Sequence, residues 1–81
     1  MKLFLISRKD DYGYDDFDSA VVCAENEETA RNTNPNGSGP VEWGQKWTSW
    51  ANHPDLVVVT YLGEADPNVA AGVVCSSFNA G

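Results

Sequence analysis

The sequence predicts a single α+β domain: a four-stranded, mainly antiparallel sheet with one or two short helices on one of its faces. Three observations lead to this fold class. The chain has 81 residues, which is the length of one domain with one core. Its β-forming runs fall into an N-terminal pair and a C-terminal pair. The segment between the pairs carries helix signals, so the expected order is strand, strand, helix, a second short helix, strand, strand.

The first strand is expected from Lys2 to Arg8. Side chains alternate across a strand, so Leu3 and Leu5 face one side while the residues between and after them face the other. Both faces are apolar, which predicts an inner strand. Residues 9–18 read as a loop that bends at Gly13, and residues 19–24 as a shorter second strand at an edge of the sheet.

A short helix is expected at residues 25–32. Asn26 is a suitable N-cap, and Glu27 and Glu28 place negative charge at the positive end of the helix dipole. Arg31 lies near the other end, where a cation is favoured. The loop at residues 34–40 follows, because the residue before Pro35 avoids the helical region.

Trp43, Trp47 and Trp50 are spaced four and then three residues apart, which places three indoles on one face of a helix at residues 42–51. Gly44 weakens this prediction by about 1 kcal/mol relative to alanine. Indoles serve both as core residues and as interface hot spots. We expect the core role, with Trp50 or Trp43 as the more exposed ring.

The run at residues 55–63 is the longest stretch of β-forming residues, and both of its faces are apolar. A strand of this kind is typically covered on two sides, so we expect it at the centre of the sheet. Residues 64–68 form a turn, and residues 72–78 the last strand. The two inner strands, 2–8 and 55–63, would lie side by side, with the other two strands outside them.

Composition limits the class of partner. The net charge of −7 argues against free nucleic acid and against an anionic membrane, because like charges repel. The apolar run at residues 3–6 is shorter than a signal peptide requires, and no stretch approaches the roughly 20 residues of a membrane span. We therefore expect a cytoplasmic protein. Cys23 and Cys75 are then expected to be reduced thiols of the core, with a disulfide as the less favoured alternative.

The most unusual feature is an acidic, aromatic loop. Residues 10–28 hold eight of the twelve carboxylates and no basic residue. Negative charge combined with aromatic contact area is typical of a surface that binds a basic protein. The alternative is a solvated hairpin loop whose rings fold back onto the core. On the first interpretation, the candidate partner-binding residues are Asp10, Asp11, Tyr12, Tyr14, Asp15, Asp16, Phe17 and Asp18.

Metal binding and catalysis find little support in the sequence. An EF-hand loop needs a fixed spacing of acidic residues around a glycine, and the residues before Gly13 do not match it. His53 is the single histidine, and no serine or cysteine stands beside it as a nucleophile. We expect no catalytic residue, no metal and no cofactor.

The chain resembles a family of small proteins encoded in bacteriophage and prophage genomes. The resemblance covers most of the chain outside residues 32–54 and rests on residues 1–8, 14–22, 27–31, 62–65 and 77–81. It implies an accessory protein in an infected bacterial cytoplasm. Small acidic phage proteins are often non-enzymatic inhibitors of host machinery, including CRISPR surveillance complexes, and the resemblance transfers no functional residue.

Two functions are therefore expected. The first is a non-enzymatic protein that binds and inhibits a host protein with a basic surface, such as a nucleic-acid-handling defence complex. The alternative is a structural or assembly role, as a virion accessory or as a homodimer joined through an edge strand or the tryptophan face.

Overall fold

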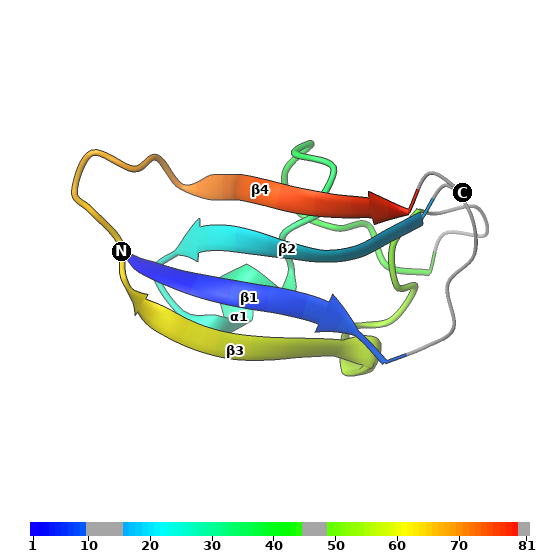
Figure 1. Cartoon of the computed structure of the whole chain (residues 1–81). Helices are drawn as coiled ribbons and strands as arrows, with labels where there is room; N and C mark the ends of the chain where they lie inside the picture. Colours follow the sequence, from blue (N-terminus) through cyan, green and yellow to red (C-terminus); the bar gives the residue numbers. More distant parts are fainter. Residues whose placement is uncertain (10–15, 45–48, 80–81) are drawn as a thin grey trace.

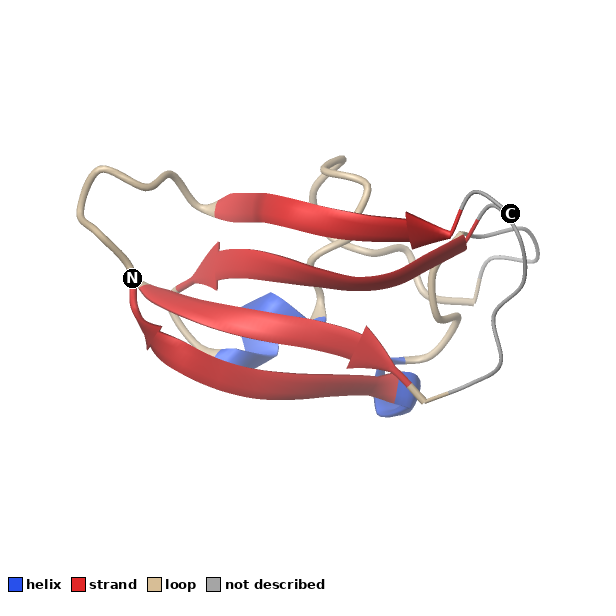
Figure 2. Cartoon of the chain, in the orientation of Figure 1, coloured by secondary structure: helices blue, strands red, loops and turns tan. Residues whose placement is uncertain are grey.

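A computed structural model describes residues 1–9, 16–44 and 49–79 of the chain. These residues form one four-stranded antiparallel sheet with one short α-helix and a single 3-10 turn (Figures 1 and 2). The α+β fold class predicted from the sequence is confirmed. The elements are β1 (Lys2–Arg8), β2 (Asp16–Ala24), α1 (Glu27–Arg31), η1 (Pro54–Leu56), β3 (Val57–Glu64) and β4 (Gly72–Asn79).

The strand order is β3-β1-β2-β4. The expected pairing of the first and third strands is present, since β1 and β3 are antiparallel neighbours. The position predicted for β3 is wrong: β3 is an edge strand, and β2, which we expected at an edge, lies inside the sheet between β1 and β4. The apolar character of both faces of β3 was therefore a misleading sign of a central position. At the edge of the sheet, its apolar residues Val58, Tyr61 and Leu62 remain exposed.

One face of the sheet holds the core. Phe4 pairs with Val22 and Ile6 with Ala20 across β1 and β2, so these four side chains point the same way. Figure 1 shows α1 behind the sheet on this face. The described parts of residues 32–56 pack on the same side. The buried cluster comprises Phe4, Ile6, Ala20, Val22, Ala24, Ala30, Trp50, Ala51 and Val57.

The helix α1 lies within the range expected from the sequence, residues 25–32, and has the expected N-cap. The side chain of Asn26 accepts a hydrogen bond from the backbone N–H of Thr29 at 2.8 Å, as expected of an N-cap. Ala30 is fully buried against the sheet. At the helix end, Arg31 donates from its guanidinium to the main-chain oxygens of Pro54 and Val57. The helix is thereby attached to the start of β3.

The helix expected at residues 42–51 is absent from the described part of that range, which is residues 42–44 and 49–51. Gly44 has φ of +84°, a left-handed conformation that interrupts a right-handed helix. Trp50 is nevertheless 1% exposed, in agreement with the core role expected of the tryptophans as a group. It is thus wrong that Trp50 is one of the more exposed rings.

The connection between β3 and β4 passes around the end of the sheet where the N-terminus lies (Figure 1). It joins the two opposite edges of the sheet, so these strands do not form a hairpin. The N–H of Ala65 donates to the main-chain oxygen of Met1 at 3.0 Å, which attaches the connection to the start of β1. The Sγ of Cys23 lies 3.9 Å from the main-chain oxygen of Val69.

Candidate functional site

The described part of the predicted partner-binding segment lies at the N-terminal end of β2. Asp16, Phe17 and Asp18 belong to this strand, although we expected β2 to begin at Ser19. The other candidate residues, Asp10, Asp11, Tyr12, Tyr14 and Asp15, lie outside the described residues. The structure therefore places three of the eight candidates, and it places them next to one another in an interior strand.

The backbone at this end of β2 is held on both sides. The N–H of Phe17 donates to the main-chain oxygen of Ser49 at 2.8 Å, and Arg8 donates from Nη1 to the main-chain oxygen of Phe17 at 3.1 Å. The Arg8 guanidinium also lies 5.7 Å from the centre of the Trp50 ring, within the range of a cation–π contact. These contacts fix Phe17 and its two acidic neighbours relative to the core.

Phe17 forms an aromatic pair with Phe78 of β4. The two residues are register partners, and their ring centroids lie 4.8 Å apart at an interplanar angle of 57°. The ring of Phe17 packs against the buried cluster, whereas Phe78 is 46% exposed. The pair therefore connects the core to the surface next to Asp16 and Asp18.

Asp18 occupies an irregular position in the ladder between β2 and β4. Phe17 pairs with Phe78 and Ser19 with Ser77, so Asp18 is the extra residue of a β-bulge. Its carboxylate oxygen Oδ1 accepts a hydrogen bond from the hydroxyl of Ser19 at 3.1 Å. Asp16, Phe17 and Asp18 are all half-buried. We refer to Asp16, Phe17, Asp18 and Phe78 as the acidic end.

Phe78 is the member of the acidic end that sequence reasoning did not find. We expected the last strand beside the third one, far from the acidic segment. In the structure β4 pairs with β2 instead, which brings Phe78 to Phe17. No motif in the sequence marks this pair, since both residues are ordinary aromatic residues near the end of a strand.

The basic side chains contribute to the fold. Three of the five Lys and Arg residues donate to main-chain oxygens: Lys2 to that of Glu25 at 3.4 Å, Arg8 to that of Phe17, and Arg31 as described above. With twelve carboxylates against five cations, the molecule carries a strong excess of negative charge. Such an excess creates a field that attracts positively charged partners and repels anionic ones.

The tryptophans of the described chain line the core. Trp43 is half-buried, packs against the buried cluster, and donates from Nε1 to Oδ1 of Asn32 at 2.8 Å. Together with the buried Trp50, this agrees with the core role that we favoured over an interface. Trp47 lies outside the described residues.

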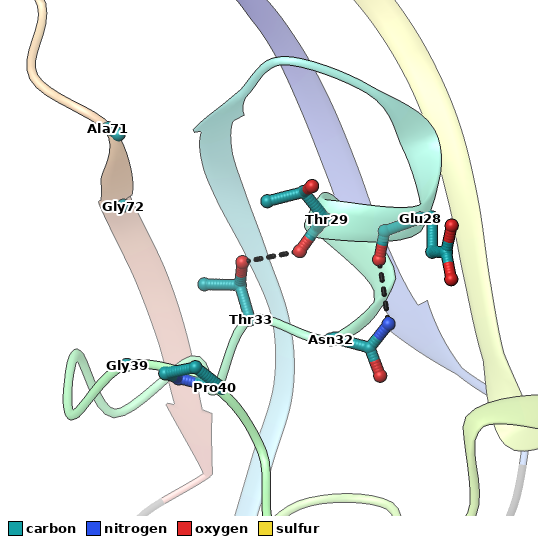
Figure 3. A pocket seen from close by; sticks show the side chains of 8 residues that line it. All are labelled: Glu28, Thr29, Asn32, Thr33, Gly39, Pro40, Ala71 and Gly72. Atoms are coloured by element: carbon teal, nitrogen blue, oxygen red, sulfur yellow. Dashed lines mark hydrogen bonds between the residues drawn. The ribbon is translucent and has the colours of Figure 1, made fainter.

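A shallow hollow of about 490 Å³ lies between α1, the segment after it and the start of β4 (Figure 3). Its polar groups are engaged locally, since Thr33 donates to the main-chain oxygen of Thr29 and Asn32 to that of Glu28, each at 2.8 Å. The residues that line it are Glu28, Thr29, Asn32, Thr33, Gly39, Pro40, Ala71 and Gly72. Glu28 is the single carboxylate among them.

The two cysteines are free thiols. Cys23 is buried, as expected of a core thiol, but Cys75 is exposed, so its expected place in the core is wrong. The difference arises because Cys75 pairs with Val21, and this position faces away from the side of the sheet on which Ala20 and Val22 form the core. Within residues 1–9, 16–44 and 49–79, no group of three or more His, Cys, Asp or Glu side chains is arranged to hold a metal ion.

Comparisons of this chain with protein-family models, with curated proteins and with solved structures find no match. None of the helices in the described residues has the length and apolar character needed to cross a membrane.

Proposed function

We propose that this chain is a non-enzymatic binding protein that docks its acidic end on a positively charged protein surface. The observation that carries the proposal is the Phe17–Phe78 pair flanked by Asp16 and Asp18. It combines an exposed aromatic ring with carboxylates at one end of the sheet. Aromatic anchors contribute much of the binding energy at protein interfaces, while charges at the rim mainly set the association rate and its salt dependence.

The partner is a basic surface of the kind that normally holds nucleic acid. A compact molecule of net charge −7 is attracted to such a surface and competes there with a phosphate backbone. We propose that the chain acts in a bacterial cytoplasm as a bacteriophage inhibitor of a host defence complex. The resemblance to phage-encoded proteins that we infer from the sequence motivates this step, and the binding role rests on the exposed ring of Phe78 beside Asp16 and Asp18.

The proposal is tested by comparing two variants of equal charge. Asp16→Lys with Asp18→Lys changes the acidic end, and Glu25→Lys with Glu28→Lys changes exposed carboxylates at the start of α1. Each pair adds four charges, so −7 becomes −3 in both variants. Immobilised wild-type protein and both variants would be incubated with a bacterial lysate, and the captured proteins quantified by mass spectrometry.

We expect basic nucleic-acid-handling proteins on the wild type and on the α1 variant, with release by salt, and their loss on the acidic-end variant. Circular dichroism of both variants verifies that each is folded. Equal capture by the two variants would show that total charge, and not the acidic end, determines binding.

A further inference from the structure

The sheet has two unpaired edges among its described strands, β3 and β4, and they differ in charge. The outward N–H and C=O groups of an edge strand can pair with a further strand. The β3 strand has a carboxylate at or near each end, because it ends at Glu64 and begins shortly after Asp55. The main-chain oxygen of its first residue, Val57, accepts a hydrogen bond from Arg31. β4, by contrast, contains no Asp, Glu, Lys, Arg or His between Gly72 and Asn79. The β4 edge is therefore the neutral edge of a strongly acidic molecule.

The exposed apolar residues of β4 are arranged symmetrically. Val74 is 50% exposed and Phe78 46% exposed, and they lie two residues before and two residues after Ser76. Val74 is the extra residue of a bulge opposite Val21 and Val22, and regular pairing with β2 resumes at Cys75. If a second β4 runs antiparallel about an axis at Ser76, each Val74 lies opposite a Phe78.

We propose that two copies of the chain associate through their β4 strands, antiparallel and about a two-fold axis that passes through Ser76. The two four-stranded sheets then form one continuous sheet of eight strands. In this register, Val74 pairs with the partner's Phe78, Cys75 with the partner's Ser77, and Ser76 with itself. Pairs of a β-branched and an aromatic residue directly opposite one another are favourable in antiparallel sheets.

A second copy fits this edge better than a charged partner strand does. Self-pairing of β4 brings no two like charges into register, because the strand has none. It also covers the exposed parts of Val74 and Phe78 in both copies at once, as the self-complementary interface of a two-fold dimer requires. Because Phe78 is also the exposed ring of the acidic end, the dimer and docking through Phe78 compete for the same side chain. The repulsion between two molecules of charge −7 acts over a longer distance and is screened by salt. The dimer is therefore strengthened by salt, whereas docking on a basic surface is weakened by it.

The association is tested by light scattering on wild-type protein and two lysine variants, at low and at high ionic strength. Ser76→Lys places two lysines directly opposite each other at the axis, which is unfavourable. Thr60→Lys makes the same change of charge at an exposed position of the other edge strand, β3. We expect a mass twice the 8.8 kDa of one chain for wild type and Thr60→Lys, with the monomer mass for Ser76→Lys.

The register is tested by disulfide formation under air. The variant Cys75→Ser with Ser76→Cys carries its exposed thiol on the axis. Directly opposed residues have Cα atoms about 4.5–5.5 Å apart, within the range of a disulfide. In wild type, the two Cys75 residues would be diagonal neighbours with Cα atoms about 7–8 Å apart, which is beyond that range. We therefore expect a covalent dimer from the variant, at least tenfold faster than from wild type or from Cys75→Ser with Ser77→Cys.

Two sets of results would overturn the proposal. The first set comes from light scattering. The proposal is wrong if wild-type protein has the mass of a monomer at millimolar concentration and high salt, or if the Thr60→Lys variant is monomeric while the Ser76→Lys variant is still a dimer. The other is cross-linking of wild type as fast as that of the Ser76→Cys variant, which would place the axis elsewhere. A variant that has lost its sheet signal in circular dichroism is replaced by Ser76→Glu, for which the same loss of the dimer is expected.

Discussion

Arg31 donates a hydrogen bond from its guanidinium to the main-chain oxygen of Val57, 26 residues further along the chain. The same Nη1 also donates to the main-chain oxygen of Pro54 at 3.1 Å. One side chain at the end of α1 therefore holds η1 and the first residue of β3. An apolar side chain of similar length, such as methionine, could fill this space but could not donate a hydrogen bond.

We predict that Arg31→Met lowers the free energy of unfolding by about 1.5–3 kcal/mol, the range for hydrogen bonds that involve a charged group. Methionine keeps much of the apolar stem, so the loss reports the hydrogen bonds to Pro54 and Val57. Arg31→Lys should lose less, because an ammonium group can still donate to one of the oxygens. Urea unfolding followed by circular dichroism measures both. A change below about 0.5 kcal/mol for methionine would contradict this role.

Among the described residues, Trp50 is the largest fully buried side chain, so its replacement should be strongly damaging. We predict that Trp50→Ala costs about 3–5 kcal/mol, because it removes apolar contact and leaves a cavity. A domain of this length has a total stability of about 4–12 kcal/mol, so the variant is expected to be largely unfolded at 37 °C. Val58→Ala, at a position that is 38% exposed, serves as control and should cost less than about 1 kcal/mol. Thermal unfolding curves would distinguish the two.

The phenol of Tyr61 donates a hydrogen bond to Oε2 of Glu64 at 2.6 Å. This bond, together with slight desolvation and the negative charge of Glu64, raises the pKa of Tyr61 above its usual value of 10.0. Stability from this interaction is present below the pKa of the unfolded chain and is lost as the pH rises through the folded pKa. We predict that Glu64→Ala lowers the pKa of Tyr61 toward 10, as measured by tyrosinate absorbance with Tyr61→Phe as the blank. An unchanged titration would exclude the bond in solution.

The two cysteines should differ sharply in reactivity. Cys75 is exposed on β4 and Cys23 is buried, and neither forms a disulfide. Since modification requires access to the thiol, we predict one rapid equivalent of alkylation under native conditions and a second after denaturation. The Cys75→Ser variant should lose the rapid equivalent, and Cys23→Ser should keep it. Mass spectrometry of timed samples measures both. Two equivalents at similar rates would mean that Cys23 is accessible.

The sequence predicts local structure well where the signal depends on neighbouring residues. The N-cap at Asn26 depends on one oxygen within reach of the next turn, and it is present. The alternation of Phe4 and Ile6 with Leu3 and Leu5 depends on the pleat alone, and the first pair is buried while the second is half-buried. Such features are determined within a few residues, so they do not depend on the arrangement of the strands.

The order of the strands could not be obtained in this way. Residues 65–71 are long enough either for a hairpin or for a passage to the far edge, and nothing in their composition distinguishes the two. The acidic run after the expected second strand, with Glu25, Glu27 and Glu28, suggested an edge, yet β2 lies inside the sheet between β1 and β4. The candidate site was therefore found in part: the carboxylates were visible in the sequence, and the contact of Phe17 with Phe78 was not.

The connection from one edge of the sheet to the other also determines how the chain can fold. β4 joins β2 with Val21 opposite Cys75, so contacts that close this ladder span most of the polypeptide. Closing so long a loop is entropically costly, and proteins rich in such distant pairings reach their native state slowly. The hairpin of β1 and β2 can form early, because its strands are close in the sequence, whereas β4 can pair only once β2 has taken its extended conformation. The β1–β3 ladder pairs residues about equally far apart in the sequence, such as Leu5 and Thr60, so we expect β3 and β4 both to join the sheet after the β1–β2 hairpin.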